Sequence, residues 1–137
     1  MGNVNVHIAL RNSFDVGASK RGLIKETEIR QTSVDALVDT GAITLVINQE
    51  LFRKLGLLNT GERETSFANN EKTMCIITEP VEISWENRVI AVPAIVVEDA
   101  PMVLLGVLPL EGMDVKVDPV NQKLVGVHGE RLLYNVI

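Results

Sequence analysis

An aspartate set between two apolar segments is the feature that most restricts how this chain can fold. Residues 36–55 have the sequence ALVDTGAITLVINQELFRKL, in which DTGA at residues 39–42 separates two runs typical of β-strands, 34–38 and 43–47. Burying an unpaired carboxylate at such a place is unfavourable. Asp39 therefore either starts a tight turn, by accepting a hydrogen bond from the backbone two residues on, or has a chemical role.

A short helix is predicted directly after the second apolar run. Asn48 is a suitable N-cap, and Glu50 falls in the first turn, where the helix dipole favours an acid. Gly56 fits the position just beyond the helix, where a left-handed backbone is common. The apolar residues of this segment share one helical face: Leu51, Phe52 and Leu55.

Alternating or continuous apolar residues predict strands along most of the remaining chain, at 3–10, 23–32, 76–85, 88–97, 103–106, 115–117, 123–127 and 131–137. Residues 11–20 are expected to form a loop or a wide turn, and residues 107–113 a brief helix. Pro93 predicts an edge position or an irregularity in its strand. We therefore expect one all-β domain, residues 1–137, with one or two short helices.

Composition excludes several classes of function. The chain has 137 residues, of which 46% are hydrophobic and only 4% aromatic, so its core must be aliphatic. A net charge of −5 argues against nucleic acid as a partner, and no apolar run is long enough to predict a membrane span. The single cysteine, Cys75, excludes an internal disulfide, and His7 and His128 lack the spacing of metal ligands. We expect a soluble cytoplasmic protein without a metal.

The order of these segments resembles that of the retropepsin-like aspartic proteases, the single-lobed branch of clan AA. The resemblance extends over residues 4–127 and rests on DTGA after two apolar residues, the helix ending in LGL at 55–57, a polar hairpin at 60–74 and the LLG run at 104–106. Gly106 lies 106 − 39 = 67 residues beyond Asp39, a spacing that this family also uses.

The resemblance implies a closed β-barrel, the acid protease fold, and hydrolysis of peptide bonds without a cofactor. In such enzymes two carboxylates share a proton, and together they activate a water molecule and polarise the peptide carbonyl. Asp-Thr-Gly occurs once in this chain, so the second carboxylate must come from a second copy. We therefore expect a homodimer with an isologous two-fold axis and a peptide or protein as substrate.

Residue roles follow from the same resemblance. Asp39 is the catalytic carboxylate, Thr40 is expected to hydrogen-bond across the two-fold axis, and Gly41 to bring its backbone close to the carboxylate. Ala42 keeps the floor of the cleft small and offers no hydroxyl to an ionised carboxylate, so we expect activity at mildly acidic pH. Three residues are expected to pack beneath the Asp39 loop: Leu104, Leu105 and Gly106.

The polar hairpin occupies the position of the flap that closes over substrate. Its tip lacks the glycines that are usual in viral relatives, and the residues expected to contact substrate are Phe67, Ala68, Asn69 and Asn70. Ile43 and Val107 stand where viral enzymes often carry an acid and an arginine, and the tail at 131–137 is a candidate dimer strand. These departures leave two alternatives open: a non-catalytic peptide-binding or dimerisation module, and an unrelated ligand-binding β-barrel.

Overall fold

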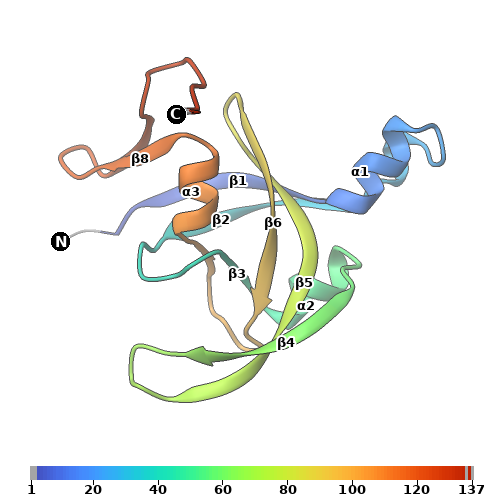
Figure 1. Ribbon diagram of the computed structural model, residues 1–137, viewed down its shortest axis with the longest axis horizontal. Coiled ribbons are helices and arrows are strands. Elements are labelled where there is room, and N and C mark those ends of the chain that lie inside the picture. Colours follow the sequence, from blue (N-terminus) through green and yellow to red (C-terminus); the bar gives the residue numbers. More distant parts are fainter. Residues whose placement is uncertain (1–2, 135, 137) are drawn as a thin grey trace.

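The computed structural model describes residues 3–134 and 136, and most of its elements are strands (Figure 1). The strands are β1 (Asn5–Asn12), β2 (Gln31–Val38), β3 (Leu45–Ile47), β4 (Asn59–Ser66), β5 (Lys72–Trp85), β6 (Arg88–Val96), β7 (Val103–Leu105), β8 (Val115–Asp118) and β9 (Lys123–Gly126). The helices are α1 (Ser13–Lys20), α2 (Gln49–Lys54) and α3 (Val107–Gly112), with a 3₁₀ turn, η1, at Glu26–Glu28. In this part of the chain, no helix has the length and hydrophobicity needed to cross a membrane.

The sheet closes on itself. Within the described residues, six strands pair in the order β1-β2-β7-β3-β6-β5, and β5 pairs back with β1. The β2–β7 and β3–β6 pairs are parallel, and the other pairs in this ring are antiparallel. Strand β4 extends the sheet as the hairpin partner of β5, whereas β8 and β9 form a separate ribbon. The predicted closed β-barrel with few helices is therefore confirmed.

Strand alternation gives the central strands one buried face and one partly exposed face. Leu105 pairs with Leu45, and Leu45 pairs with Ala94; all three side chains are fully buried. On each of these strands the adjacent residue in the sequence points to the opposite face, and Leu37 on β2 lies on that face too. The residues of that second row are Leu37, Leu104, Val46 and Ile95, which pair in register across β2, β7, β3 and β6.

The second helix forms as predicted. The Asn48 side chain accepts a hydrogen bond from the Leu51 backbone N–H at 2.9 Å, as an N-cap does. Gly56 follows the helix with φ of +60°, a conformation that glycine adopts without strain. The predicted hairpin between β8 and β9 and the brief helix α3 are also confirmed.

The prediction of a loop at residues 11–20 is wrong, because residues 13–20 form α1. Asn12 caps this helix by accepting from the Asp15 backbone N–H at 3.1 Å. Asp15 in turn accepts two hydrogen bonds from the Arg30 side chain, at 2.8 and 2.9 Å, and one from the Arg30 backbone N–H. These contacts join α1 to the segment just before β2.

The strand predicted at 23–32 is also wrong for the most part, since η1 occupies its centre and β2 begins at Gln31.

Two further predictions needed revision. Pro93 is not on an edge strand, because β6 lies between β3 and β5; the predicted irregularity exists as a register shift between Ile77 and Pro80 of β5, and Pro80 faces Pro93. In the tail predicted as a strand, residues 131–134 and 136 form no strand beyond a single bridge from Arg131, and residues 135 and 137 lie outside the described part.

Side-chain contacts hold the tail against the barrel instead. The buried Asp114 carboxylate accepts from His128 Nδ1 at 2.8 Å and from the Leu133 backbone N–H at 3.3 Å. The buried Arg88 guanidinium donates to the Met113 and Gly129 carbonyls. The chain therefore packs back against the start of β6 and the end of α3 after β9, rather than continuing as a strand.

Candidate active site

Asp39 lies at the end of β2, at the start of a tight loop. Its backbone N–H donates to the Leu105 carbonyl at 3.0 Å, which continues the β2–β7 pairing by one residue. Its side-chain Oδ1 accepts from the Gly41 backbone N–H at 2.9 Å, and its carbonyl accepts from the Ala42 N–H at 3.1 Å. The carboxylate is half-buried, with Thr40 and Gly41 exposed beside it. The turn-forming interpretation of Asp39 is thus correct, and within the described residues Oδ2 forms no hydrogen bond or ion pair.

The loop that follows Asp39 is held by the start of α3. The backbone N–H groups of Gly106, Val107 and Leu108 donate to the carbonyls of Thr44, Ala42 and Ile43, at 3.1, 2.9 and 2.8 Å. The DTGA and LLG segments, far apart in sequence, are therefore joined by consecutive backbone hydrogen bonds. Such fixed backbone contacts hold a side chain in place better than a free loop would.

Gly106 is the point of closest approach. A Cβ atom at this position would lie 2.4 Å from the Ala42 carbonyl oxygen and 2.5 Å from that of Thr44. Both contacts are with backbone atoms, which cannot rotate away. The LLG motif therefore ends in glycine because the Asp39 loop passes directly against it, and Leu104 and Leu105 lie on the strand beneath, β7.

Asp39 lines a cavity of about 880 Å³. Most of its lining is apolar, and it includes the second row of residues formed by β2, β7, β3 and β6, in which Val46 is buried and the others are half-buried. The lining residues are Leu37, Asp39, Gly41, Ala42, Ile43, Val46, Arg63, Glu64, Thr65, Ser66, Phe67, Ala68, Ile95, Val97, Ala100, Pro101, Met102 and Leu104. Its size and its few polar groups are typical of a cavity that binds a largely apolar ligand.

The β4–β5 hairpin supplies the opposite wall of this cavity. Phe67 and Ala68 line the cavity, and Asn69 and Asn70 form the exposed turn beyond them. Asn70 has φ of +67°, and the Asn69 side chain accepts from the Glu71 N–H at 3.0 Å, so the two asparagines form the turn as predicted. In Figure 1 the tip of this hairpin and the loop between β2 and β3 lie at the same edge of the molecule, whereas α1 lies at the opposite end.

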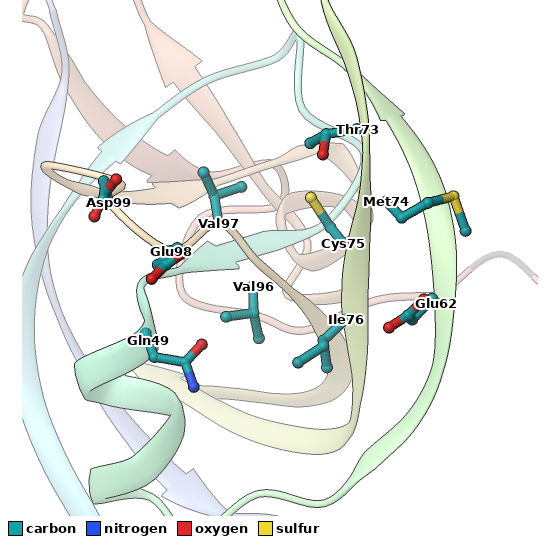
Figure 2. A pocket seen from close by; sticks show the side chains of 10 residues that line it. All are labelled: Gln49, Glu62, Thr73, Met74, Cys75, Ile76, Val96, Val97, Glu98 and Asp99. Carbon is teal, nitrogen blue, oxygen red and sulfur yellow. The ribbon is translucent and has the colours of Figure 1, made fainter.

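A second cavity, of about 430 Å³, lies between β5, the end of β6 and α2 (Figure 2). It is bordered by the buried thiol of Cys75 and by three acids, Glu62, Glu98 and Asp99. Figure 2 shows Glu98 and Asp99 on the side away from Glu62, so these acids do not converge. No cluster of metal-ligating side chains occurs anywhere among the described residues. Of these two cavities, the larger brings a carboxylate, a fixed loop and the tip of a hairpin together.

The described carboxyl groups with a shifted pKa lie outside the large cavity. Hydrogen bonds from Arg30 lower the pKa of Asp15, those from His128 lower the pKa of Asp114, and those from Asn121 lower the pKa of Asp118. In each case the partner stabilises the ionised form. These three groups stabilise α1, the tail and the β8–β9 turn, respectively, and we assign them no part in chemistry.

A family model described as "gag-polyprotein putative aspartyl protease" matches residues 25–111, well over half of the chain. This chain belongs to that family of retropepsin-like aspartic proteases. The match contains both the DTGA and the LLG segments. The expected family is confirmed.

Two solved structures are similar to this chain, and the first of them has the same fold. EIAV protease complexed with the inhibitor HBY-793 is 18% identical, with a TM-score of 0.58, over 85% of this chain and 93% of that one. A retropepsin-like aspartic protease from Rickettsia conorii is 19% identical, with a TM-score of 0.45, over 86% and 89%. No curated protein matches the sequence significantly.

Sequence reasoning missed most of the side walls of this retropepsin cavity. Leu37, Val46 and Ile95 were visible only as members of apolar strands. Alternation along each strand would have separated them from their buried neighbours, but only once the pairing register was known. Arg63, which lies in the polar hairpin, carried no signal that set it apart from the surrounding charged residues.

Proposed function

We propose that this chain is a homodimeric aspartic endopeptidase in which each subunit contributes one Asp39. The observation that carries the proposal is the Asp39 loop itself. Its carboxylate is held by the Gly41 N–H, the loop is fixed by three N–H groups of residues 106–108, and the carboxylate faces a largely apolar cavity of about 880 Å³.

The proposed chemistry needs both Asp39 side chains, one ionised and one protonated. The ionised Asp39 takes a proton from a water molecule while the water oxygen attacks the carbonyl carbon of the peptide bond. The protonated Asp39 donates to the carbonyl oxygen, which polarises the bond. Transfer of a proton to the leaving nitrogen then allows the C–N bond to break, giving a carboxyl group and an amine.

The remaining roles concern position rather than proton transfer. Thr40 is exposed at the edge of the loop, as a group that contacts a second subunit must be. Phe67 and Ala68 would cover a peptide from the side opposite Asp39, and the asparagine turn at 69–70 would let the hairpin open and close. Ile43, exposed beside the loop, and Leu108, exposed at the start of α3, would be covered by the partner subunit.

A peptide-library digest tests the proposal. Wild type should cleave a subset of peptides at mildly acidic pH, and Asp39→Asn should cleave none. Asp35→Asn is the matched control, because Asp35 is on the same strand, has a side chain that is 77% exposed, and contacts His7 rather than the cavity. It should cleave like wild type.

Two results would count against an endopeptidase. Equal cleavage by wild type and Asp39→Asn would mean that another group, or a contaminant, performs the hydrolysis. Binding of peptides by both proteins, with cleavage by neither, would instead support a non-catalytic peptide-binding module.

A further inference from the structure

The charged side chains of the large cavity are unequally distributed. Among the described residues that line it, Asp39 and Glu64 are acidic and Arg63 is the single basic residue. Asp39 has the proposed catalytic role, so Arg63 and Glu64 are the remaining charged groups that could bind a charged group of a ligand. The direction of each side chain decides between them.

Strand pairing places Arg63 on the cavity face of β4. Ile95 lines the cavity, and its partner across β5 is Ile77, which in turn pairs with Gly61. Cross-strand partners share a face, and residues two apart on a strand share it too. Arg63, two residues after Gly61, therefore points to the same face as Ile95.

Burial along β4 agrees with this direction. Thr65 and Phe67, which follow Arg63 at intervals of two, are half-buried and line the cavity. Glu62 and Glu64 occupy the intervening positions of β4, and successive side chains of a strand point to opposite faces. The side chain of Glu64 is thus directed away from the face that carries Arg63.

The Arg63 guanidinium is available to a ligand. It is exposed, and within the described part of the chain it forms neither an ion pair nor a side-chain hydrogen bond. A guanidinium presents parallel N–H donors that match the two oxygens of a carboxylate. An apolar cavity with one such group on its wall favours a ligand that is mainly apolar and carries one carboxylate at a fixed distance.

We propose that Arg63 determines specificity by binding an acidic side chain of the substrate peptide. The inference rests on the proposed endopeptidase function and names its substrate class. Arg63 lies four residues before Phe67, about 13 Å along an extended strand, so the acidic residue would lie several positions from the scissile bond. In a two-fold symmetric dimer both ends of the cleft carry Arg63, so an acid on either side of that bond is favoured.

Kinetics on a charge-scanned peptide series test this assignment. One cleaved peptide is made with Glu, Gln or Lys at each position in turn, and kcat/KM is measured for each. Wild type should prefer Glu to Gln about five-fold at the positions that reach Arg63, and salt should reduce the preference. Arg63→Gln should remove the preference, and Arg63→Glu should transfer it to Lys. Arg53→Glu, an equal charge change on an exposed residue of α2 outside the cavity, should leave it intact.

Each outcome points to one of the two proposals. Two results would overturn the role of Arg63 and leave the endopeptidase proposal intact. One is cleavage that depends on Asp39 but shows no preference for acidic peptides. The other is a preference for acidic peptides that persists in Arg63→Gln. If wild type cleaves no peptide that Asp39→Asn leaves intact, the endopeptidase proposal is overturned, and the role of Arg63 is overturned with it.

Discussion

Gly106 and the Asp39 loop depend on each other through direct backbone contact. Because a Cβ atom at residue 106 would meet two carbonyl oxygens at 2.4 and 2.5 Å, Gly106→Ala should displace the loop. We expect a loss of about 2 kcal/mol in the free energy of unfolding, measured with urea, and loss of peptide cleavage.

Gly17→Ala is the matched control for this substitution. Gly17 is in α1, where the added methyl group would meet only the end of the flexible Arg21 side chain, at 3.0 Å. This variant should be more stable by about 0.5–1 kcal/mol, because alanine favours the helix. Equal effects of the two substitutions would contradict a special role for Gly106.

Asp15 makes stability depend on pH at a site far from the cavity. Hydrogen bonds from Arg30 lower the pKa of Asp15 in the folded chain below its ordinary value of 3.8, so the stabilisation is complete above that value and is lost as the pH falls through the folded-state pKa. Asp15→Asn should cost about 2 kcal/mol at pH 7, and the difference from wild type should shrink below about pH 4. Urea unfolding at several pH values measures this; a difference that is constant down to pH 2 would contradict it.

At the scale of elements, the sequence predicted those segments whose signals are local. The α2 helix carries its own cap in Asn48 and its own terminator in Gly56, and the β4–β5 turn has asparagines at the positions that need them. The α1 helix was missed because SFDVGASK contains a glycine and two serines and has little helical preference. Its stability comes from Asn12 and from Arg30, which is fifteen residues beyond Asp15, and such contacts cannot be read from a local pattern.

The residues of the candidate site likewise fall into two groups, those that local motifs predicted and those that they did not. Asp39 and Gly106 were identifiable because their motifs are short and contiguous, whereas the cavity walls depend on register across β3, β6 and β7. The tail was predicted as a strand from the apolar residues of RLLYNVI. Two contacts that hold the tail against the barrel, Leu133 with Asp114 and Gly129 with Arg88, join residues 19 and 41 positions apart, and they outweighed that pattern.

The β4–β5 hairpin should depend on the backbone of Asn70. Its φ of +67° is tolerated by asparagine and glycine but is strained for a β-branched residue. Asn70→Gly should keep the turn and retain cleavage, whereas Asn70→Val should lower kcat/KM several-fold. The same strain should lower the free energy of unfolding of Asn70→Val in urea by about 1 kcal/mol, whereas Asn70→Gly should change it little. Equal kcat/KM values for the two variants would show that the turn geometry does not affect cleavage.

At the scale of the whole molecule, the proposed mechanism needs a second copy of the chain to complete the site. The Asp39 loop and the hairpin tip lie at one edge of the barrel, where a second copy would bring its own Asp39 alongside (Figure 1). The exposed side chains of Ile43 and Leu108 flank this edge, so self-association would remove them from water. The proposed dimer axis passes between the two Asp39 side chains.

The most direct test of this account is cleavage of one peptide by a fixed amount of wild type mixed with increasing Asp39→Asn. If each active site needs one Asp39 from each of two subunits, capture of wild-type subunits in mixed dimers should reduce the rate toward zero. Added Asp35→Asn, which keeps Asp39, should instead increase the rate. A rate that stays constant as Asp39→Asn is added would contradict the shared site.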